Sequence, residues 1–573
     1  MIIAVASAIL IFAYKSGFVT FSGLKTTTRS EPFEIDLLYY VPDNASIISV
    51  CGSGMRNIAK YRESPVLIEL DRLISDSSRL YNLVGNFIPE GSKPYAKEIS
   101  EKIAKIAGII INSELSRSII HIKEYVQYQS SDPGSEIPLN VSLAIMEKNI
   151  DYSADMNALI EAGLPIVMEE FEGYRFYEID YSKIFAEYLA ADKIELMRIE
   201  DFNTYFSFSE NKMATSNSKE IIVKFYRGDK NEAKPALLEK PEFKSELAKL
   251  NEIAAISDCQ GYMDFNQVMI DSLQNVEEDE SLQLLELLKK SPLSSVMQSI
   301  SYNKSLQMIQ QWNFKDDSIP AEIKKWIAVA ETSNKYDGIA NLDNSSVFAL
   351  AINGEVIKKL IEAIDNNSEA SKTISASPNL EMISDLQNLS FSISTPALGI
   401  IWPEILLSIK HVKSKELFDL AKDLIFSGLN SYGMPITKWL EKDINGKSTS
   451  YFSTPFGIGL FLTDANSELI ASSSESSIES YLSTDSKLSK TLNDLGIERI
   501  PTTLLEGYIN MYGLLALAKN TQSSLAMFLP QDINIPADYE IIAKLIGHNY
   551  YSILLAPGSV TFSFHHKPYE SNN

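Results

Sequence analysis

The chain has 573 residues, which is more than one hydrophobic core usually holds, so two or more domains are expected. Hydrophobic residues make up 45% and charged residues 22%, a balance typical of a globular protein rather than a disordered one. Acidic residues number 75 against 51 basic ones, for a formal net charge of −24. Such a surface repels phosphate backbones and anionic lipid head groups, so nucleic acid is not an expected partner.

The N-terminus carries the strongest targeting signal. Residues 1–14 are almost wholly apolar, Lys15 interrupts the run, and residues 17–21 continue it. We predict that residues 1–23 form a signal anchor or transmembrane helix, followed by a polar tether over residues 24–38. The alternatives are an export signal and a buried N-terminal helix or strand. The apolar residues expected to hold the anchor in the membrane are Ile2, Ile3, Val5, Ile9, Leu10, Ile11 and Phe12.

This placement predicts an inner-membrane anchor with the body of the protein in the periplasm or on the extracellular side. The two cysteines, Cys51 and Cys259, lie in no CxxC or metal-ligand spacing. Each ends or borders an apolar run, a pattern that favours buried free thiols. A single bridge between them is the alternative in an oxidising compartment.

The first half of the chain alternates strand and helix patterns. An apolar strand at residues 47–50 follows Pro42-Asp43-Asn44, and helical spacing of apolar residues then predicts helices over 65–84, 96–111 and 154–163. Strands are predicted over 140–146 and 174–179. A hairpin is predicted from 204–208 and 213–216, leading into a helix near 217–220 that Asn217 or Ser218 would cap.

A second hairpin with the same sequel lies far downstream. Residues 459–462 and 469–473 form its two strands, and a helix is expected to begin at 474–477. Ala214 matches Ala471, and Ser216 matches Ser473. The chain ends in a third predicted hairpin, 550–555 with 560–566, in which Val560, Phe562 and Phe564 face one side while Thr561 and Ser563 face the other.

Four landmarks recur in the same order in the two halves, which predicts an internal duplication. They are an Asp-Asn-x-Ser opening at 43–46 and 343–346, the hairpin with its helix, apolar helical triplets, and the segments Gly261–Asp264 and Gly507–Asn510. The triplets are Phe243, Leu247, Leu250 and Leu488, Leu492, Leu495. The alternative is chance similarity in a sequence rich in Ser, Asn, Ile and Lys.

The fold class that follows is α+β, with a first repeat over residues 39–335 and a second over 336–573. Each repeat is expected to be a mostly antiparallel sheet backed by helices.

Motifs that carry chemistry are not found. Gly52-Ser53-Gly54 follows a strand but lacks the third glycine of a dinucleotide-binding loop, and no Walker loop, GxSxG, HExxH or kinase signature occurs. The five histidines are widely spread, and the neighbours His565 and His566 must face opposite sides of a strand. No catalytic residue, cofactor site or metal site is therefore assigned.

Aromatic residues gather in the predicted strands. Ordinary sheet packing explains them. The functional alternative is an apolar groove for a lipid or an unfolded segment, lined by Tyr205, Phe206, Phe208 and Tyr262.

These parts resemble an exported, membrane-anchored bacterial family catalogued as a domain of unknown function. The resemblance rests on the N-terminal segment, the Pro42-Asp43-Asn44 opening, residues 470–475 before a helix, and the Gly261–Asp264 strand. It covers most of residues 40–573 and implies export and fold, with no activity or site to carry over. The chain departs from the pattern at Asn510, where its first half has Asp264.

The expected function is a membrane-tethered extracytoplasmic scaffold or binding protein, an accessory subunit of an envelope complex with other envelope proteins as partners. Two alternatives stay open. One is a carrier or chaperone with an apolar cavity for lipid or unfolded chain, and the other is a hydrolase of unrecognised type.

Overall fold

The structure is a computed structural model of the chain. It describes residues 35–42, 44–52, 64–85, 93–130, 138–179, 204–230, 241–253, 257–265, 267–268, 293–315, 338–358, 386–396, 402–431, 438–453, 459–465, 467–483, 487–497, 499, 504–525, 537–556 and 558–569. The predicted anchor and residues 24–34 of the predicted tether lie outside these ranges. The chain divides into two compact units, Met1–Ile319 with Pro536–Ile542 and Pro320–Ile535 with Ala543–Asn573.

The first unit is built on an antiparallel sheet. Its described strands are β1 (Ala45–Cys51), β2 (Ile122–Ser130), β3 (Leu139–Met146), β4 (Ile166–Phe171), β5 (Tyr174–Ile179), β6 (Thr204–Ser209), β7 (Lys212–Ser216), β8 (Cys259–Asp264), β9 (Leu293–Asn303) and β10 (Ser305–Phe314). Neighbouring strands pair in the order β10, β9, β8, β1, β2, β3, β7, β6, β5, β4, and every pairing is antiparallel.

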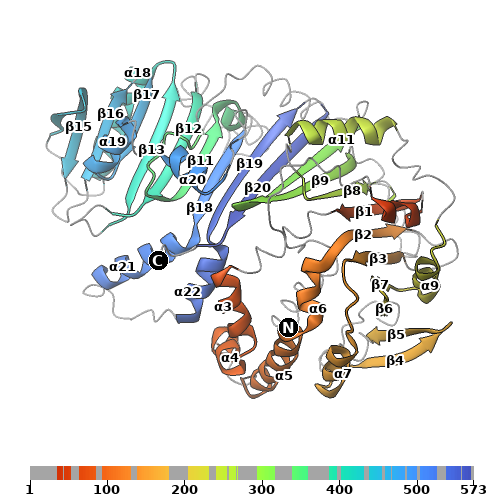
Figure 1. Ribbon diagram of the computed structural model, residues 1–573. Coiled ribbons are helices and arrows are strands. Elements are labelled where there is room, and N and C mark those ends of the chain that lie inside the picture. The colour runs from red at the N-terminus through yellow and green to blue at the C-terminus, as the bar shows by residue number, and fades with distance from the viewer. Residues whose placement is uncertain are drawn as a thin grey trace, which may run out of the picture. The chain divides into compact units, whose positions relative to one another are not determined.

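The second unit holds a sheet of the same kind (Figure 1). Its described strands are β11 (Ser346–Asn353), β12 (Leu386–Ser394), β13 (Glu404–His411), β14 (Leu440–Ile444), β15 (Lys447–Ser453), β16 (Gly459–Ala465), β17 (Glu468–Ser472), β18 (Leu505–Asn510), β19 (His548–Ala556) and β20 (Ser559–Lys567). They pair antiparallel in the order β20, β19, β18, β11, β12, β13, β17, β16, β15, β14. This is the order of the first unit with ten added to each strand number.

The helices complete a mixed, largely antiparallel α+β structure, as expected. In the first unit the described helices are η1 (Asp36–Tyr40), α3 (Pro65–Ile74), α4 (Ser77–Gly85), α5 (Lys93–Asn112), α6 (Glu114–Arg117), η3 (Ser118–His121), α7 (Ser153–Glu161), α9 (Lys219–Arg227) and α11 (Pro241–Ile253). The remainder are α18 (Ser414–Ser431), α19 (Glu475–Leu482), α20 (Leu488–Asp494), α21 (Met511–Leu525) and α22 (Ala537–Ile546).

The largest core of each unit lies on one face of its sheet, under helices. In the first unit, α9 and α11 bring Ile222, Phe225 and Phe243 against the sheet residues Val50 and Val126. In the second unit, Ile478 of α19 and Leu488 and Leu492 of α20 pack on Ala349 and Ile470. We call this side of each sheet the helix-covered face, and in Figure 1 α19 and α20 lie across it. The apolar triplets predicted at 243–250 and 488–495 begin on these helices.

The body of the protein begins before the predicted end of the tether. Leu37 and Leu38 of η1 are 0% and 3% exposed and belong to the first core. An apolar pair beside two tyrosines is enough to draw this short segment into the core, although the residues before it are mostly polar.

The predicted helix over 65–84 is instead two helices. α3 ends where Ser75 bonds to the Asp71 carbonyl at 2.7 Å. Asp76 then accepts the backbone N–H groups of Ser78 and Arg79 at 3.0 and 3.2 Å and caps α4. A polar Ser-Asp pair can satisfy the backbone groups that a helix end exposes, so an apolar spacing that runs across the pair does not guarantee one helix.

The two units carry irregularities at corresponding strand positions. β1 bulges against β2 between Ala45 and Ile47, and β11 bulges against β12 between Ser346 and Phe348. Further bulges lie between β2 and β3 and between β12 and β13, again at the start of β2 and of β12. A bulge shifts every later side chain of its strand, so matching bulges keep the two registers in step.

The capping groups also correspond. Asp264 at the end of β8 accepts the N–H of Gln267 at 3.1 Å, and Asn510 at the end of β18 accepts the N–H of Gly513 at 2.9 Å. The exchange of Asp for Asn noted in the sequence therefore keeps a side-chain oxygen in the capping position.

The expected helix cap after the first hairpin is wrong. Asn217 accepts the N–H of Asn140 in β3 at 2.9 Å, and Ser218 makes no side-chain cap to α9. In the second unit Ser473 likewise accepts the N–H of Ile405 at 2.8 Å. Asn217 therefore corresponds to Ser473. By strand register, Ser216 of the first unit is equivalent to Ser472 of the second unit, not to Ser473. The predicted match was one residue out because repeated serines allow either alignment.

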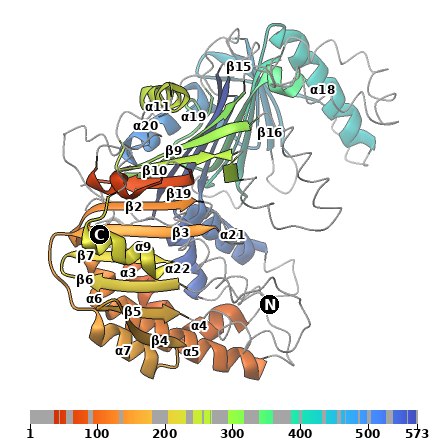
Figure 2. The same cartoon turned by 90° about the vertical axis from the view of Figure 1, so that its right-hand side faces the viewer.

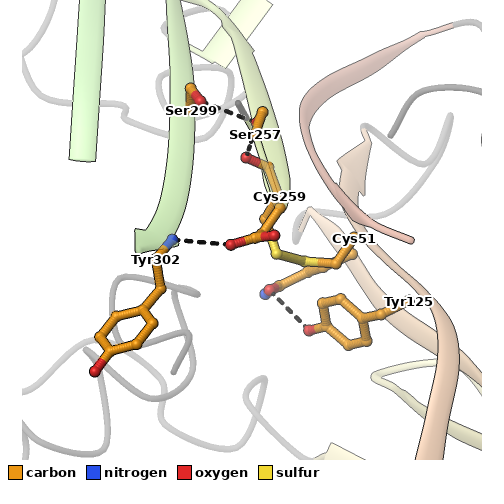
Figure 3. Close-up of a disulfide and its surroundings, with 8 residues drawn as sticks. Cys51, Tyr125, Ser257, Cys259, Ser299 and Tyr302 are labelled. Atoms are coloured by element: carbon orange, nitrogen blue, oxygen red, sulfur yellow. Dashed lines mark hydrogen bonds between the residues drawn. A yellow bond between two sulfur atoms is a disulfide. The ribbon is translucent and has the colours of Figure 1, made fainter. Parts of the chain in front are cut away.

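The cysteines are joined, which corrects the expectation of free thiols. Cys51 of β1 lies opposite Cys259 of β8, and the two form a disulfide across the central strands (Figure 3). Both were rightly expected to be buried, at 0% and 1% exposure. Hydrogen bonds from Ser299 to Ser257 and from Ser257 to the Cys259 carbonyl, at 2.9 and 2.8 Å, lie beside the bridge. The corresponding pair in the second unit is Ile352 and Leu505.

Loss of this bridge is expected to destabilise the first unit alone. The disulfide closes a loop of 208 residues, so Cys51→Ser with Cys259→Ser should lower the free energy of unfolding by about 3–5 kcal/mol through the freer unfolded chain. Denaturant unfolding of the full chain, followed by hydrogen exchange in each unit, measures the change. The transition of the second unit is the internal control. Equal unfolding midpoints for the wild type and the double variant would contradict the expectation.

Candidate functional site

The second unit presents a broad apolar surface on the side of its sheet opposite the helix-covered face. Six neighbouring strands, β13, β12, β11, β18, β19 and β20, each contribute three residues to it, and strand pairing arranges these residues in three rows. The middle row is Leu407, Phe391, Leu350, Gly507, Tyr551 and Phe564; one flanking row is Ile409, Leu389, Ile352, Leu505, Ile553 and Phe562; and the other is Ile405, Ile393, Phe348, Ile509, Asn549 and His566. We call these three rows the apolar face.

The apolar side chains of this face stay in contact with solvent. All of them are half-buried except Ile405, which is 42% exposed. The rings of Phe348 and Phe391 pack edge to face at a centroid distance of 6.1 Å. Tyr551 lies over Gly507, where an added Cβ would come 2.0 Å from the tyrosine ring. Glycine at this position lets the large ring lie flat on the sheet.

Helix α18 bounds the apolar face at one end. The middle row continues from Leu407 through Ala471 and Leu462 to Ser450. Lys422 of α18 donates a hydrogen bond to Ser450 at 2.8 Å, so α18 covers this extension. Figure 2 shows α18 on the other side of the strands from α19 and α20.

Burial in β12 and β20 is the reverse of the usual alternation. In β12 the serines Ser390 and Ser392 are 3% and 1% exposed, while the alternating residues Leu389 and Phe391 are only half-buried. Ser390 donates to the Gly338 carbonyl at 3.2 Å on the helix-covered face. Small side chains let the covering segments approach closely, and the large apolar side chains are left to the opposite face.

The corresponding middle row of the first unit is polar. Matched strand by strand, its middle row is Ser142, Gln127, Ser49, Gly261, Gln298 and Gln310. Only the glycine is common to both middle rows. Gln298 lies over Gly261 as Tyr551 lies over Gly507, with its Cβ 3.5 Å from the position of an added Cβ. The same backbone framework therefore carries a polar row in one unit and an apolar row in the other.

One corner of the apolar face is polar and holds histidines. His566 and Asn549 form a hydrogen bond at 3.1 Å. His548 in the same hairpin bonds to the Tyr508 hydroxyl at 2.8 Å. His565 is 1% exposed on the helix-covered side, with its ring edge-on to Tyr550 at 5.6 Å. As predicted, His565 and His566 face opposite sides of β20. Burial lowers the pKa of His548, His565 and His566 to about 4.

The residues of the predicted apolar groove do not line one surface. Tyr205 packs against the first core, and Tyr262 in that core meets Phe243 edge to face at 5.0 Å. Phe206 and Phe208 lie on the opposite face, where they pack with Met156 and Leu159 of α7. The ring centroids of Phe208 and Tyr152 are 4.1 Å apart. Neighbouring strand residues point to opposite faces, so the string of aromatics is divided between two cores.

The ionisable cluster around Glu506 in the second unit is buried. Glu506 of β18 is fully buried and pairs with Arg499 at 2.9 Å. It also accepts hydrogen bonds from the Tyr550 hydroxyl at 3.2 Å and from the Ile339 N–H at 3.1 Å. These partners fix the segment around Ile339 to the sheet, which is a structural role. Within the described ranges, no three His, Cys, Asp or Glu side chains gather as metal ligands would.

Comparison with known proteins adds little to this geometry. No family model matches the chain, and none of the curated proteins matches it. A solved structure of TP0453 in crystal form IV is 13% identical, covering 40% of this chain and 78% of that one with a TM-score of 0.17. A likeness at this level assigns neither fold nor function. Among the helices that the structure describes, none is long and apolar enough to cross a membrane.

The histidines of the β19–β20 hairpin predict a loss of stability in mild acid. Their folded pKa of about 4 lies below the ordinary value of 6.5, so the unfolded chain binds protons first as the pH falls. The stabilisation is complete above pH 6.5 and is lost as the pH falls from 6.5 to 4. Each histidine then lowers the free energy of unfolding by on the order of 3 kcal/mol.

Two measurements test this expectation. NMR titration of the imidazole Cε1–H signals should show the three rings still neutral at pH 5, where the free side chain is protonated. The free energy of unfolding of the second unit, measured with denaturant, should be the same at pH 8 and pH 7 and should fall below pH 6.5. Protonation of all three rings near pH 6.5 in the folded protein would refute the prediction.

Proposed function

We propose that the chain is a membrane-tethered extracytoplasmic binding protein, a scaffold or accessory subunit of an envelope complex that works through surfaces rather than bond chemistry. The observation that carries the proposal is the apolar face. Its three rows offer about 600 Å² of sheet, from a strand spacing of roughly 4.8 Å and a same-face repeat of roughly 6.8 Å. That is at the upper end of the patches that soluble monomers expose, and such patches mark interaction sites.

The disulfide supports a location outside the cytosol. Bridges such as Cys51–Cys259 form and persist in oxidising compartments, whereas cytosolic thiols are kept reduced. The anchor at residues 1–23, the inner-membrane attachment and the envelope partners stay part of the proposal, as does the resemblance to an exported family. The charge of −24 continues to argue against nucleic acid as a partner.

We also propose that the two units arose by duplication. Their strand orders agree throughout the ten described strands of each. Their bulges and their side-chain bonds from Asn217 and Ser473 fall at corresponding positions. Long-range strand order and local bulges are independent features, so their joint agreement favours a common origin over chance similarity in composition.

A carrier or chaperone for lipid or unfolded chain is the second candidate function. The apolar face favours it as well, because an apolar ligand could lie on the same side chains. The two candidates differ in geometry, since ligand pockets enclose most of a ligand's surface, whereas a sheet face touches an occupant from one side only. The hydrolase alternative gains no support from the described residues.

Binding of an apolar dye should depend on the residues in the middle row of the apolar face. Leu350→Ser with Phe391→Gln gives the second unit the residues that the first unit carries at these places, and most of the fluorescence of a bound anilinonaphthalene dye should be lost. The matched control is the reverse exchange, Ser49→Leu with Gln127→Phe, which should add dye binding to the first unit. Unchanged dye binding in a folded Leu350→Ser, Phe391→Gln protein would remove the observation on which the proposal rests.

The location is tested separately. Full-length protein from cells should partition with membranes, and its two cysteines should resist alkylation until a reductant is added. Deletion of residues 2–23 should release the chain from the membrane. Cytosolic, fully reduced and fully functional protein after that deletion would refute the tethered extracytoplasmic role.

A further inference from the structure

The apolar face is neutral as well as apolar. Its eighteen positions include no Asp, Glu, Lys or Arg, although the whole chain carries a net charge of −24. Two such chains repel each other, and the repulsion is weakest where the surfaces that meet carry no charge. At physiological ionic strength, charges more than about 8 Å from the contact are largely screened. A surface of this kind is compatible with a second copy of itself.

The size of the face also fits self-association. Two copies placed face to face would bury about 1,200 Å² in total, which is where specific, stable interfaces begin. Sheets pack on one another about 10 Å apart with interleaved side chains. The two-fold arrangement needs one self-complementary patch, and the three rows supply it. The aromatic residues Phe348, Phe391 and Tyr551 provide the large, rigid contacts typical of interface centres.

We propose that a second copy of this chain docks on the apolar face, so that the sheets of two second units pack face to face around a two-fold axis. The inference rests on the proposed binding role of that face and names its occupant. A lipid hydrocarbon chain is a less suitable occupant of the apolar face. Lying on an open sheet, it would keep about half of its own surface in water. The polar middle row of the first unit gives that unit no equivalent face.

Cysteine crosslinking in native membranes tests the proposal with the full chain. Both natural cysteines are in the disulfide, so Phe391→Cys introduces the single free thiol. A bismaleimide should then join two chains into a product of twice the chain mass. The matched control is Gln127→Cys, at the corresponding position of the polar row, which should give little of this product. Adding Leu350→Ser and Tyr551→Gln to the Phe391→Cys chain should reduce the crosslinked fraction several-fold.

Salt separates this contact from one made by ion pairs. The crosslinked fraction should rise with salt, because salt screens the mutual repulsion of two acidic chains and leaves apolar contact intact. Thermal unfolding and protease resistance establish that each variant is folded.

A folded Phe391→Cys chain that gives no self-crosslink overturns the proposal, as does equal crosslinking through Gln127→Cys. A crosslink from Phe391→Cys to a different protein, or to lipid-derived material, also overturns it but leaves the proposed binding function in place. Loss of dye binding on increasing the wild-type concentration, with no such loss for Leu350→Ser, Phe391→Gln, supports the same contact by an independent measurement.

Discussion

The antiparallel backbone ladder is the constraint on which the rest of this structure depends. Each strand has neighbours in fixed register, and side chains alternate between faces, so pairing decides which residues share a surface. A slip of one residue in β12 would bring Leu389, Phe391 and Ile393 under the helices and turn the serines outward. The bulge at the start of β12 and the matching bulge in β2 show that the register is set locally as well as by the core. Everything proposed for the apolar face follows from this register.

The reversed burial in the second unit has an energetic consequence. The helix-covered face is lined with small residues such as Ala349, Ala351 and Ser392, which let α19 and α20 lie close to the strands. The larger apolar side chains are thereby left half in water. Each 100 Å² of apolar surface that stays exposed forgoes about 2.5 kcal/mol of stabilisation. A fold that leaves a continuous apolar area in this state gains substantially when an occupant covers it, whereas the first unit, with Gln127 and Gln298 in the corresponding row, gains little.

Local patterns in the sequence revealed the hairpins but not the surfaces. The hairpins at 204–216, 459–473 and 548–567 are formed by adjacent strands whose alternation is visible in the sequence. The alternation in β20 was also visible, but nothing local indicated that Thr561 and Ser563, rather than Phe562, would be buried. The pairing of β1 with β8 joins segments 208 residues apart, so no local pattern favours the disulfide over free thiols. Phe206 and Phe208 were grouped with Tyr205 by proximity in sequence, although adjacent positions in a strand belong to different faces. No local pattern predicts the apolar face, because it takes its residues from six strands. Long stretches of chain separate β11 from β12, β13 from β18, and β18 from β19.

The correspondence between the units is closest where the backbone is concerned. Side-chain oxygens recur at Asp264 and Asn510, and at Asn217 and Ser473, because each satisfies a backbone N–H. The first pair does so where a helix begins and the second pair where a strand begins. The two units differ where side chains act on their own. The central pair is a disulfide in one and Ile352 with Leu505 in the other. Backbone hydrogen bonds hold the framework together. The side chains on the face opposite the helix-covered face can therefore change without loss of the fold. Differences in function between the two units are therefore expected in the rows of side chains on the face opposite the helix-covered face. The second unit carries the rows that suit an apolar partner.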